Sequence, residues 1–288
     1  MNRYVNVLRK IHIHPVFWAI IGLSILTAKF WELLLLFSIV LVHELGHGFA
    51  AAHFKWKIKQ ILLLPFGGVA EMEEHGNRPV KEEVIVILAG PFQHVWLAIL
   101  AYFLYIGEVI TLQTFEMFFS FNVMILVVNL LPIWPLDGGK LLFILLSKYY
   151  AFSIAHEKAL RFSFFFLIAF SILYLIVAPL HLNVWIIVAF LLFSLIQEWR
   201  QRHYVFIRFL LERYYGRKNE FTSLKPIVVD EKDKLLQVLY QFKRDCKHSI
   251  VVMKGNAKQE PLDENELLHA YFAEKLTSIN IGDILYSY

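Results

Sequence analysis

The sequence has little cysteine and little charge, and both shortages restrict the class of protein. Its 288 residues include one cysteine, Cys246, which excludes a disulfide framework within the chain. Only 18% of the residues are charged, while 58% are hydrophobic. This balance is too apolar for an ordinary soluble domain of this length. We therefore expect an integral membrane protein.

The sequence also lacks a single basic patch and a signal-peptide cleavage site. The formal net charge is +4, but the basic residues lie beside apolar segments and form no single patch that would suit nucleic acid. The N-terminus carries Arg3, Arg9 and Lys10, yet the apolar stretch after it lacks the small-residue cleavage site of a signal peptide. We therefore expect no nucleic-acid partner and a first apolar segment that is retained in the membrane.

Long hydrophobic runs fill most of the first 200 residues. About six segments can be drawn, and the first and last are short against the roughly 20 residues that cross a bilayer. They are residues 15–28, 30–52, 84–106, 115–131, 162–180 and 182–196. This pattern predicts an α-helical polytopic membrane protein.

Lysine and arginine alternate between the connections of these segments. They are frequent in the N-terminus, in 53–83, in 140–161 and in 198–218, whereas the intervening connections hold only Lys29. The positive-inside rule then predicts six spans with the N- and C-termini both cytoplasmic. The end of the second span is thereby placed toward the cytoplasmic leaflet.

The segment HELGH, residues 43–47, lies in the second apolar run. If this run is helical, His43 and His47 are one turn apart on the same face and can bind one metal ion together. The pattern is HExxH, in which two imidazoles bind zinc and the carboxylate accepts a proton from water. We therefore assign His43 and His47 as metal ligands and Glu44 as the catalytic base.

Two prolines and two glycines interrupt the fourth span within NLLPIWPLDGG, residues 129–139. Helices broken at membrane depth are typical of sites that handle polar ligands. Catalytic zinc usually takes three protein ligands, so we select Asp137 as the third, although Asp-Gly-Gly also suits a plain turn. Asn129 is a candidate to hydrogen-bond an oxyanion or the substrate backbone, with local helix stabilisation as the alternative.

Two other features lie close to these motifs in the sequence. The stretch 61–72, ILLLPFGGVAEM, is too short to cross a membrane, and its Gly pair suits a tight hairpin or a re-entrant loop. Residues 65–72 of this loop are suited to accept an unwound substrate as an added strand, and an interfacial connector is the alternative. His94 is polar at membrane depth, where a hydrogen-bonded packing role is favoured over metal ligation.

The composition changes after the last apolar segment. Residues 199–220 are basic and aromatic and suit an amphipathic helix along the membrane surface. Strands at 226–229 and 249–253 alternate with helices at 235–243 and 265–273 in a small α/β module. We expect domain boundaries at 1–198, 199–220 and 221–288.

Together, HELGH at 43–47 and Leu-Asp-Gly at 136–138 resemble the paired motifs of the site-2 protease family, and Asn-Leu-Leu-Pro at 129–132 is similar to the residues that precede the second motif. The resemblance implies an intramembrane metalloprotease that binds one Zn²⁺ per chain. For the sporulation group of that family, it implies a membrane-associated sigma-factor precursor as substrate. It also implies inhibitory membrane partners and a location in the membrane that surrounds the forespore.

The tail module resembles a single CBS domain, so the fold expected is a polytopic membrane domain with a small α/β CBS-like cytoplasmic domain. That resemblance implies regulation through an adenine nucleotide. Asp263 and Glu266 stand where the CBS family often has a threonine or serine and an aspartate. CBS modules commonly pair, so a chain with one module is expected to form a homo-oligomer.

A CBS-gated metal transporter or a membrane metal sensor is the alternative from another class, because histidines and a broken helix also suit ion pathways. The single HExxH motif and the lack of an evident inverted repeat argue against it.

Overall fold

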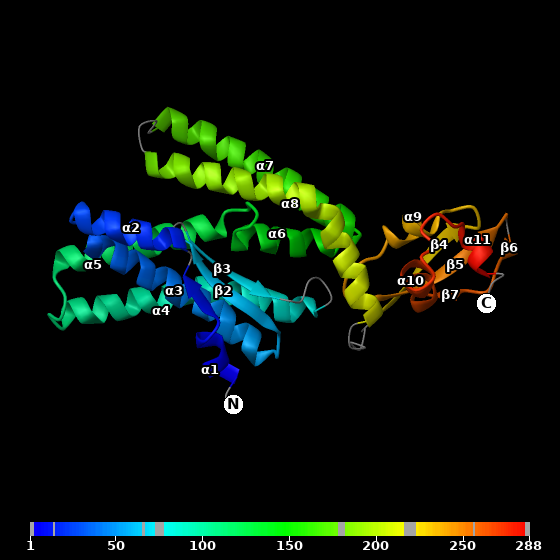
Figure 1. Ribbon diagram of the computed structural model, residues 1–288, viewed down its shortest axis with the longest axis horizontal. Coiled ribbons are helices and arrows are strands. Elements are labelled where there is room, and N and C mark those ends of the chain that lie inside the picture. Colours follow the sequence, from blue (N-terminus) through cyan, green and yellow to red (C-terminus); the bar gives the residue numbers. More distant parts are fainter. Residues whose placement is uncertain are drawn as a thin grey trace. The chain divides into compact units, whose positions relative to one another are not determined.

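The computed structural model describes residues 3–13, 15–64, 67–72, 78–177, 182–215, 223–255 and 257–285. Most of these residues are helical, and five of the helices are long and apolar enough to cross a membrane. They are α3 (Phe30–His53), α4 (Val80–Ile106), α5 (Leu112–Leu130), α7 (Phe152–Val177) and α8 (Leu182–Tyr215) (Figure 1). The expectation of a polytopic α-helical membrane protein is confirmed.

The first of the six expected spans is shorter than predicted. It forms α2 (Pro15–Leu26), which has 12 residues and so rises by about 18 Å, against the roughly 30 Å of a bilayer core. The chain reverses at Ala28, whose φ is +58°, and α3 returns beside α2, with the rings of Phe17 and Phe37 4.7 Å apart. By length and composition, five helices rather than six therefore qualify as spans within the described residues.

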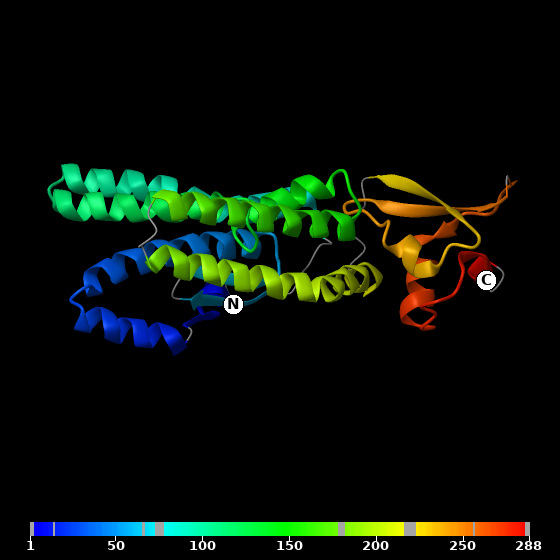
Figure 2. The same cartoon turned by 90° about the horizontal axis from the view of Figure 1, so that it is seen from above.

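A three-stranded sheet lies near the end of α3 that carries HELGH (Figures 1 and 2). β1 (Ile11–Ile13) pairs in parallel with β2 (Ile58–Leu64), and β2 pairs in antiparallel with β3 (Gly67–Met72). The predicted hairpin is thus present, while its turn, Pro65 and Phe66, lies outside the described residues. Because β1 precedes α2 and β2 follows α3, their pairing brings both ends of the α2–α3 hairpin to one side.

Buried apolar side chains hold this sheet against α3 and α4. They come from the helix α1 (Arg3–Leu8), from α3, from β2 and from α4, and they are Val7, Ala51, Ala52, Ile58, Ile61 and Val86. Burying such side chains removes apolar area from contact with water or lipid headgroups and contributes roughly 1.5–3 kcal/mol for each large one. The strands are therefore fixed beside the helix that carries the two histidines.

The fourth span breaks where the prolines and glycines predict it. α5 ends at Leu130, and α6 (Asp137–Ser147) begins at Asp137. A Cβ on Gly138 would lie 2.2 Å from the carbonyl oxygen of Leu130 and 2.4 Å from that of Leu131. Glycine at this position therefore allows α6 to start directly against the end of α5, and this packing positions the Asp137 side chain.

The described chain divides into two compact units. The first comprises Met1–Glu74, Lys81–Leu141 and Phe166–Leu191, and the second His75–Val80, Leu142–Phe165 and Leu192–Tyr288. Helices α7 and α8 run side by side within each unit. In the first unit the rings of Tyr174 and Trp185 lie 6.5 Å apart, and in the second those of Phe164 and Trp199 lie 6.3 Å apart.

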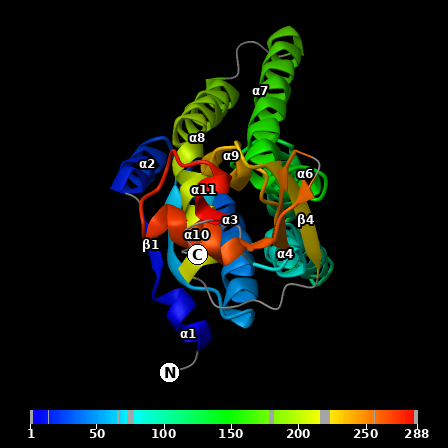
Figure 3. The same ribbon diagram turned by 90° about the vertical axis from the view of Figure 1, so that its right-hand side faces the viewer.

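The second unit ends in a small α/β module. The module begins with a β-α-β unit made of the strand β4 (Leu224–Asp230), the helix α9 (Leu235–Leu239) and the strand β5 (Lys247–Lys254). The strands β4 and β5 are adjacent and parallel. The short strands β6 (Ala257–Lys258) and β7 (Leu262–Asp263) pair with β5. The helices α9, α10 (Glu264–Phe272) and α11 (Ile281–Leu285) lie on one face of the sheet (Figures 2 and 3). The order strand, helix, strand, helix is the predicted one, with α9 shorter than the expected 235–243.

The expected amphipathic segment 199–220 continues α8 as far as Tyr215, and 216–220 lie outside the described residues. Its buried side chains Phe206, Phe209 and Leu210 lie on one helical face. The ring of Phe206 stacks on Tyr240 at 4.4 Å. The buried face of this segment is thus covered by protein, with Phe206 on the module and Phe209 stacked on Phe152 of α7 at 4.0 Å.

A buried ion pair completes this contact. The Nε and Nη2 atoms of Arg213 donate to the two carboxylate oxygens of Glu264, at 2.6 and 2.9 Å. Nη1 and Nη2 also donate to the carbonyl oxygens of Lys243 and Cys246, at 2.7 and 2.6 Å. A bidentate pair in which at least four of the five guanidinium hydrogens are bonded is an arrangement in which a buried charge is tolerated, so α8 is firmly joined to the module.

Candidate active site

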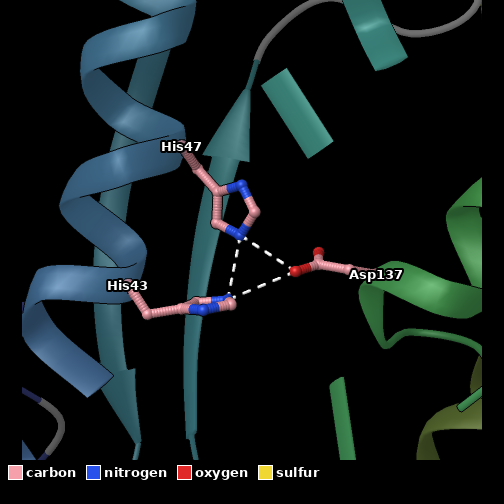
Figure 4. Close-up of side chains that lie close together, drawn as sticks. All are labelled: His43, His47 and Asp137. Atoms are coloured by element: carbon pink, nitrogen blue, oxygen red, sulfur yellow. Dashed lines mark hydrogen bonds and ion pairs between the residues drawn. The ribbon is translucent and has the colours of Figure 1, made fainter. Parts of the chain in front are cut away.

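Three side chains from two helices meet in a buried cluster (Figure 4). His43 and His47 lie one turn apart on α3, and their Nε2 atoms are 3.0 Å from each other. Asp137, the first residue of α6, places Oδ2 3.2 Å from His43 Nε2 and 3.1 Å from His47 Nε2. The helical spacing expected from HExxH and the broken helix at Asp-Gly-Gly thus bring all three predicted ligands together.

The hydrogen bonds around the cluster show what it can bind. His47 Nδ1 lies 2.8 Å from the backbone oxygen of Val86. Because a carbonyl only accepts, Nδ1 carries a hydrogen, and in the neutral ring Nε2 then presents a lone pair. Asp137 Oδ2 is buried and has no hydrogen-bond donor. Lone-pair atoms that converge without a hydrogen between them are costly unless a cation lies there. Two imidazoles and one carboxylate are a usual ligand set for catalytic zinc, so these residues fit that metal.

Glu44 lies on the same turn of α3, with 5% of its surface exposed. The backbone of β3 passes directly beside it, because a Cβ on Gly68 would lie 2.2 Å from Glu44 Cγ and 2.7 Å from Oε1. The Gly pair that suggested a hairpin therefore also makes room for the carboxylate. No feature of the local sequence pattern predicts this second use.

Gly90 on α4 makes the same kind of room for the two histidines. A Cβ there would lie 2.3 Å from His47 Nε2 and 2.8 Å from His43 Cε1. In the sequence, the Gly90-Pro91 pair indicates a kink in this span and not a contact with the histidines. The signal for Gly90 is a glycine beside a proline in the middle of an apolar span, which marks either a bend or a close approach.

Asn129 and His94, which the sequence also singles out, make other contacts. The side chain of Asn129 donates to the carbonyl oxygen of Ile125, one turn earlier in α5, at 3.0 Å; this is the local contact named as the alternative, and the oxyanion role stays a prediction. His94 is buried and its Nε2 lies 2.9 Å from Nδ1 of His43. It thus forms a hydrogen bond with the ring nitrogen of His43 that does not face the cluster.

Comparison with known proteins defines the class. The model of peptidase family M50 matches residues 31–109 and 106–170, which include the whole cluster. Over 139 residues, the chain is 37% identical to a zinc metalloprotease of Methanocaldococcus jannaschii, covering 46% of this chain and 40% of that protein. With the cluster on an apolar helix, these matches define an intramembrane zinc metalloprotease.

At full length, the chain is 50% identical to stage IV sporulation protein FB of Bacillus subtilis (strain 168), over 288 residues and 100% of both chains. The chain therefore belongs to peptidase family M50, the site-2 protease family. A solved structure of a site-2 protease from Methanocaldococcus jannaschii is 32% identical, covers 65% of this chain and 89% of that one, and has a TM-score of 0.49.

Proposed function

We propose that this protease cleaves a membrane-associated protein segment at the cluster of His43, His47 and Asp137, which would hold one Zn²⁺ per chain. The observation that carries the proposal is the buried convergence of three lone-pair atoms, two from the apolar helix α3 and one from the start of α6, with the Asp137 oxygen left without a donor. When bound, zinc supplies Lewis-acid chemistry by which water becomes a nucleophile at neutral pH.

Glu44 is the proton carrier in this scheme. Its carboxylate accepts a proton from the attacking water and delivers it to the leaving amine. The neighbouring strand β3 lies at one edge of its sheet in the described residues, in the order β1-β2-β3. An unwound substrate segment that adds to this edge would run beside Glu44, because Gly68 of β3 touches the carboxylate. Asn129 would leave its bond to Ile125 to hold the substrate backbone or the oxyanion.

The substrate and the setting follow from the resemblance to the sporulation group. The full-length similarity to a stage IV sporulation protein supports a sigma-factor precursor as substrate and inhibitory membrane proteins as partners, in the membrane around the forespore. Both termini would be cytoplasmic. The pairing of β1 with β2 supports this for the N-terminus, since it puts residues 11–13 on the same side as the lysine-rich segment after α3.

The C-terminal module would act as a CBS-like regulator that binds an adenine nucleotide and pairs with the module of a second chain. The sheet face opposite the helices supports the pairing, because Leu224 and Val228 of β4 are 65% and 64% exposed. Exposed apolar side chains on a sheet face are typical of an interaction surface. Val228→Lys should dissociate the oligomer in detergent, as light scattering would show; an unchanged mass would count against pairing through this face.

The decisive experiment uses the full chain in proteoliposomes with a single-span substrate. Wild-type protein should cleave it, a chelator should stop cleavage and added zinc should restore it. Glu44→Gln should keep its zinc and lose cleavage, whereas Asp137→Asn should lose both. Glu32→Gln, an exposed glutamate on the same helix, is the matched control and should cleave normally. Robust proteolysis by Glu44→Gln would refute the mechanism, and metal flux without cleavage would favour a transporter.

A further inference from the structure

We propose that His94 and Asn122 are positioning residues for His43, and that together they fix the imidazole tautomer in which His43 presents its lone pair to the metal. The inference rests on the proposed zinc site and extends it to two further helices, α4 with His94 and α5 with Asn122. Both residues are almost fully buried, with 1% and 2% of their surface exposed.

The chain of hydrogen bonds begins at Asn122 on α5. Its Nδ2 donates to the backbone oxygen of His94 at 2.9 Å. A backbone carbonyl can only accept, so this contact identifies the amino end of the amide. The other end, Oδ1, therefore faces His94 Nδ1, which lies 2.8 Å away, and accepts its hydrogen.

The hydrogen-bond chain continues from His94 on α4 to His43 on α3. A neutral imidazole with its hydrogen on Nδ1 has a lone pair on Nε2. In His94 this Nε2 lies 2.9 Å from His43 Nδ1, so His43 must donate from Nδ1. The lone pair of His43 is left on Nε2, the atom that lies 3.2 Å from Asp137 Oδ2 in the cluster.

The two histidines of the motif thus reach the same tautomer by different means. His47 is held by a backbone carbonyl of α4, that of Val86, whereas His43 depends on two side chains. Ligating histidines commonly donate their other N–H to such a partner, and its removal costs about 10–100-fold in metal affinity or activity. We expect a loss of this size when the acceptor at position 94 is removed.

A purely structural role would be a polar contact that packs α4 against α5, and it makes a different prediction. Loss of packing would lower the stability of the protein without changing the ligand field of the metal. Zinc affinity and the absorption spectrum of the Co²⁺-substituted protein report on the ligands themselves, so they separate the two roles.

The test compares variants of the purified full-length protein by chelator competition for zinc and by the Co²⁺ spectrum. His94→Phe keeps the ring volume but offers no acceptor, and it should lower zinc affinity about 10–100-fold and shift the spectrum. His94→Gln supplies an amide oxygen to accept from His43 and should stay within a few-fold of wild type. Asn122→Leu should weaken zinc binding, and adding it to His94→Phe should cost nothing further, because Asn122 acts through His94.

His156→Phe is the matched control. This histidine is also buried, at 3% exposure, and it pairs with Glu198; its replacement should leave zinc affinity and spectrum unchanged. Wild-type affinity in His94→Phe, or equal losses in His94→Gln and His94→Phe, would overturn the inference. If His94→Phe does not fold, unchanged zinc binding in Asn122→Leu overturns it. If wild-type protein binds no zinc, or His47→Ala leaves its zinc in place, the zinc site itself fails and takes this inference with it.

Discussion

The close approach of α4 to the two proposed ligand histidines leaves no room for a side chain at Gly90. A Cβ at this residue would lie 2.3 Å from His47 Nε2 and 2.4 Å from its Cε1, about 1.1 Å short of the 3.4 Å at which ordinary van der Waals contact begins. Metal–ligand distances tolerate only about 0.2 Å. Gly90→Ala must therefore displace a ligand ring or push α4 away from α3.

We expect Gly90→Ala to lower zinc affinity by more than the roughly 100-fold upper bound for loss of an outer hydrogen-bond partner, and to abolish cleavage. Helix propensity alone predicts the opposite sign, since alanine is favoured over glycine inside a helix by about 1 kcal/mol. Gly22 on α2 is the matched control, because a Cβ there meets nothing within 4 Å. Gly22→Ala should keep full zinc affinity and activity.

The assay measures zinc per chain after equilibration with chelators of graded affinity, together with cleavage of a reconstituted substrate. Hydrogen exchange of α3 and α4 amides checks that the variant is folded. If Gly90→Ala retained as much zinc as Gly22→Ala and cleaved at the same rate, the close approach would not constrain the site and the reasoning would be wrong.

The remaining predictions concern the base, the buried ion pair and the module. Gly68→Ala should displace the Glu44 carboxylate, whose Cγ would lie 2.2 Å from the new Cβ, so zinc should be retained while kcat falls at least tenfold; equal losses of both would refute this. Arg213→Ala leaves a buried carboxylate unpaired and should destabilise the module by about 3–5 kcal/mol, whereas Arg161→Ala breaks an exposed pair and should cost less than about 1 kcal/mol; urea unfolding compares them. Burial lowers the pKa of His248 from its usual 6.5, so below that pH the unfolded chain binds a proton that the folded module does not. Stability should then fall by up to about 1.4 kcal/mol per pH unit, measured by hydrogen exchange in the full chain, and His248→Gln should remove this slope.

Much of the architecture could be predicted from local patterns. Hydropathy identified α3, α4, α5, α7 and α8, because a helix that lies in lipid must be apolar over most of its length. Within the described residues, five helices and not the expected six are long and apolar enough to be spans, since the apolar run 15–28 forms a helix of 12 residues followed by a reversal at Ala28. Hydropathy reports what a segment can bury and not where the chain turns.

The same limit applies to the segment after the last span. Its composition predicts an amphipathic helix, and the structure contains one, but the face with Phe206 and Arg213 is covered by the module. Burial of an apolar helix face against lipid or against protein removes it from water with a similar gain in free energy. Composition alone therefore does not choose between them.

For the candidate active site, the sequence by itself determined that His43 and His47 share one helical face, because 3.6 residues per turn places them there whatever surrounds the helix. Asp137 could be proposed from the broken helix and the missing third ligand. Its place beside the histidines depends on the packing of Gly138 against α5, a contact between chain segments that no local pattern encodes. The room left by Gly90 and the hydrogen bonds from Asn122 through His94 were likewise decided only by the tertiary structure, since they join residues from separate helices, and proximity across helices is set by packing and not by periodicity.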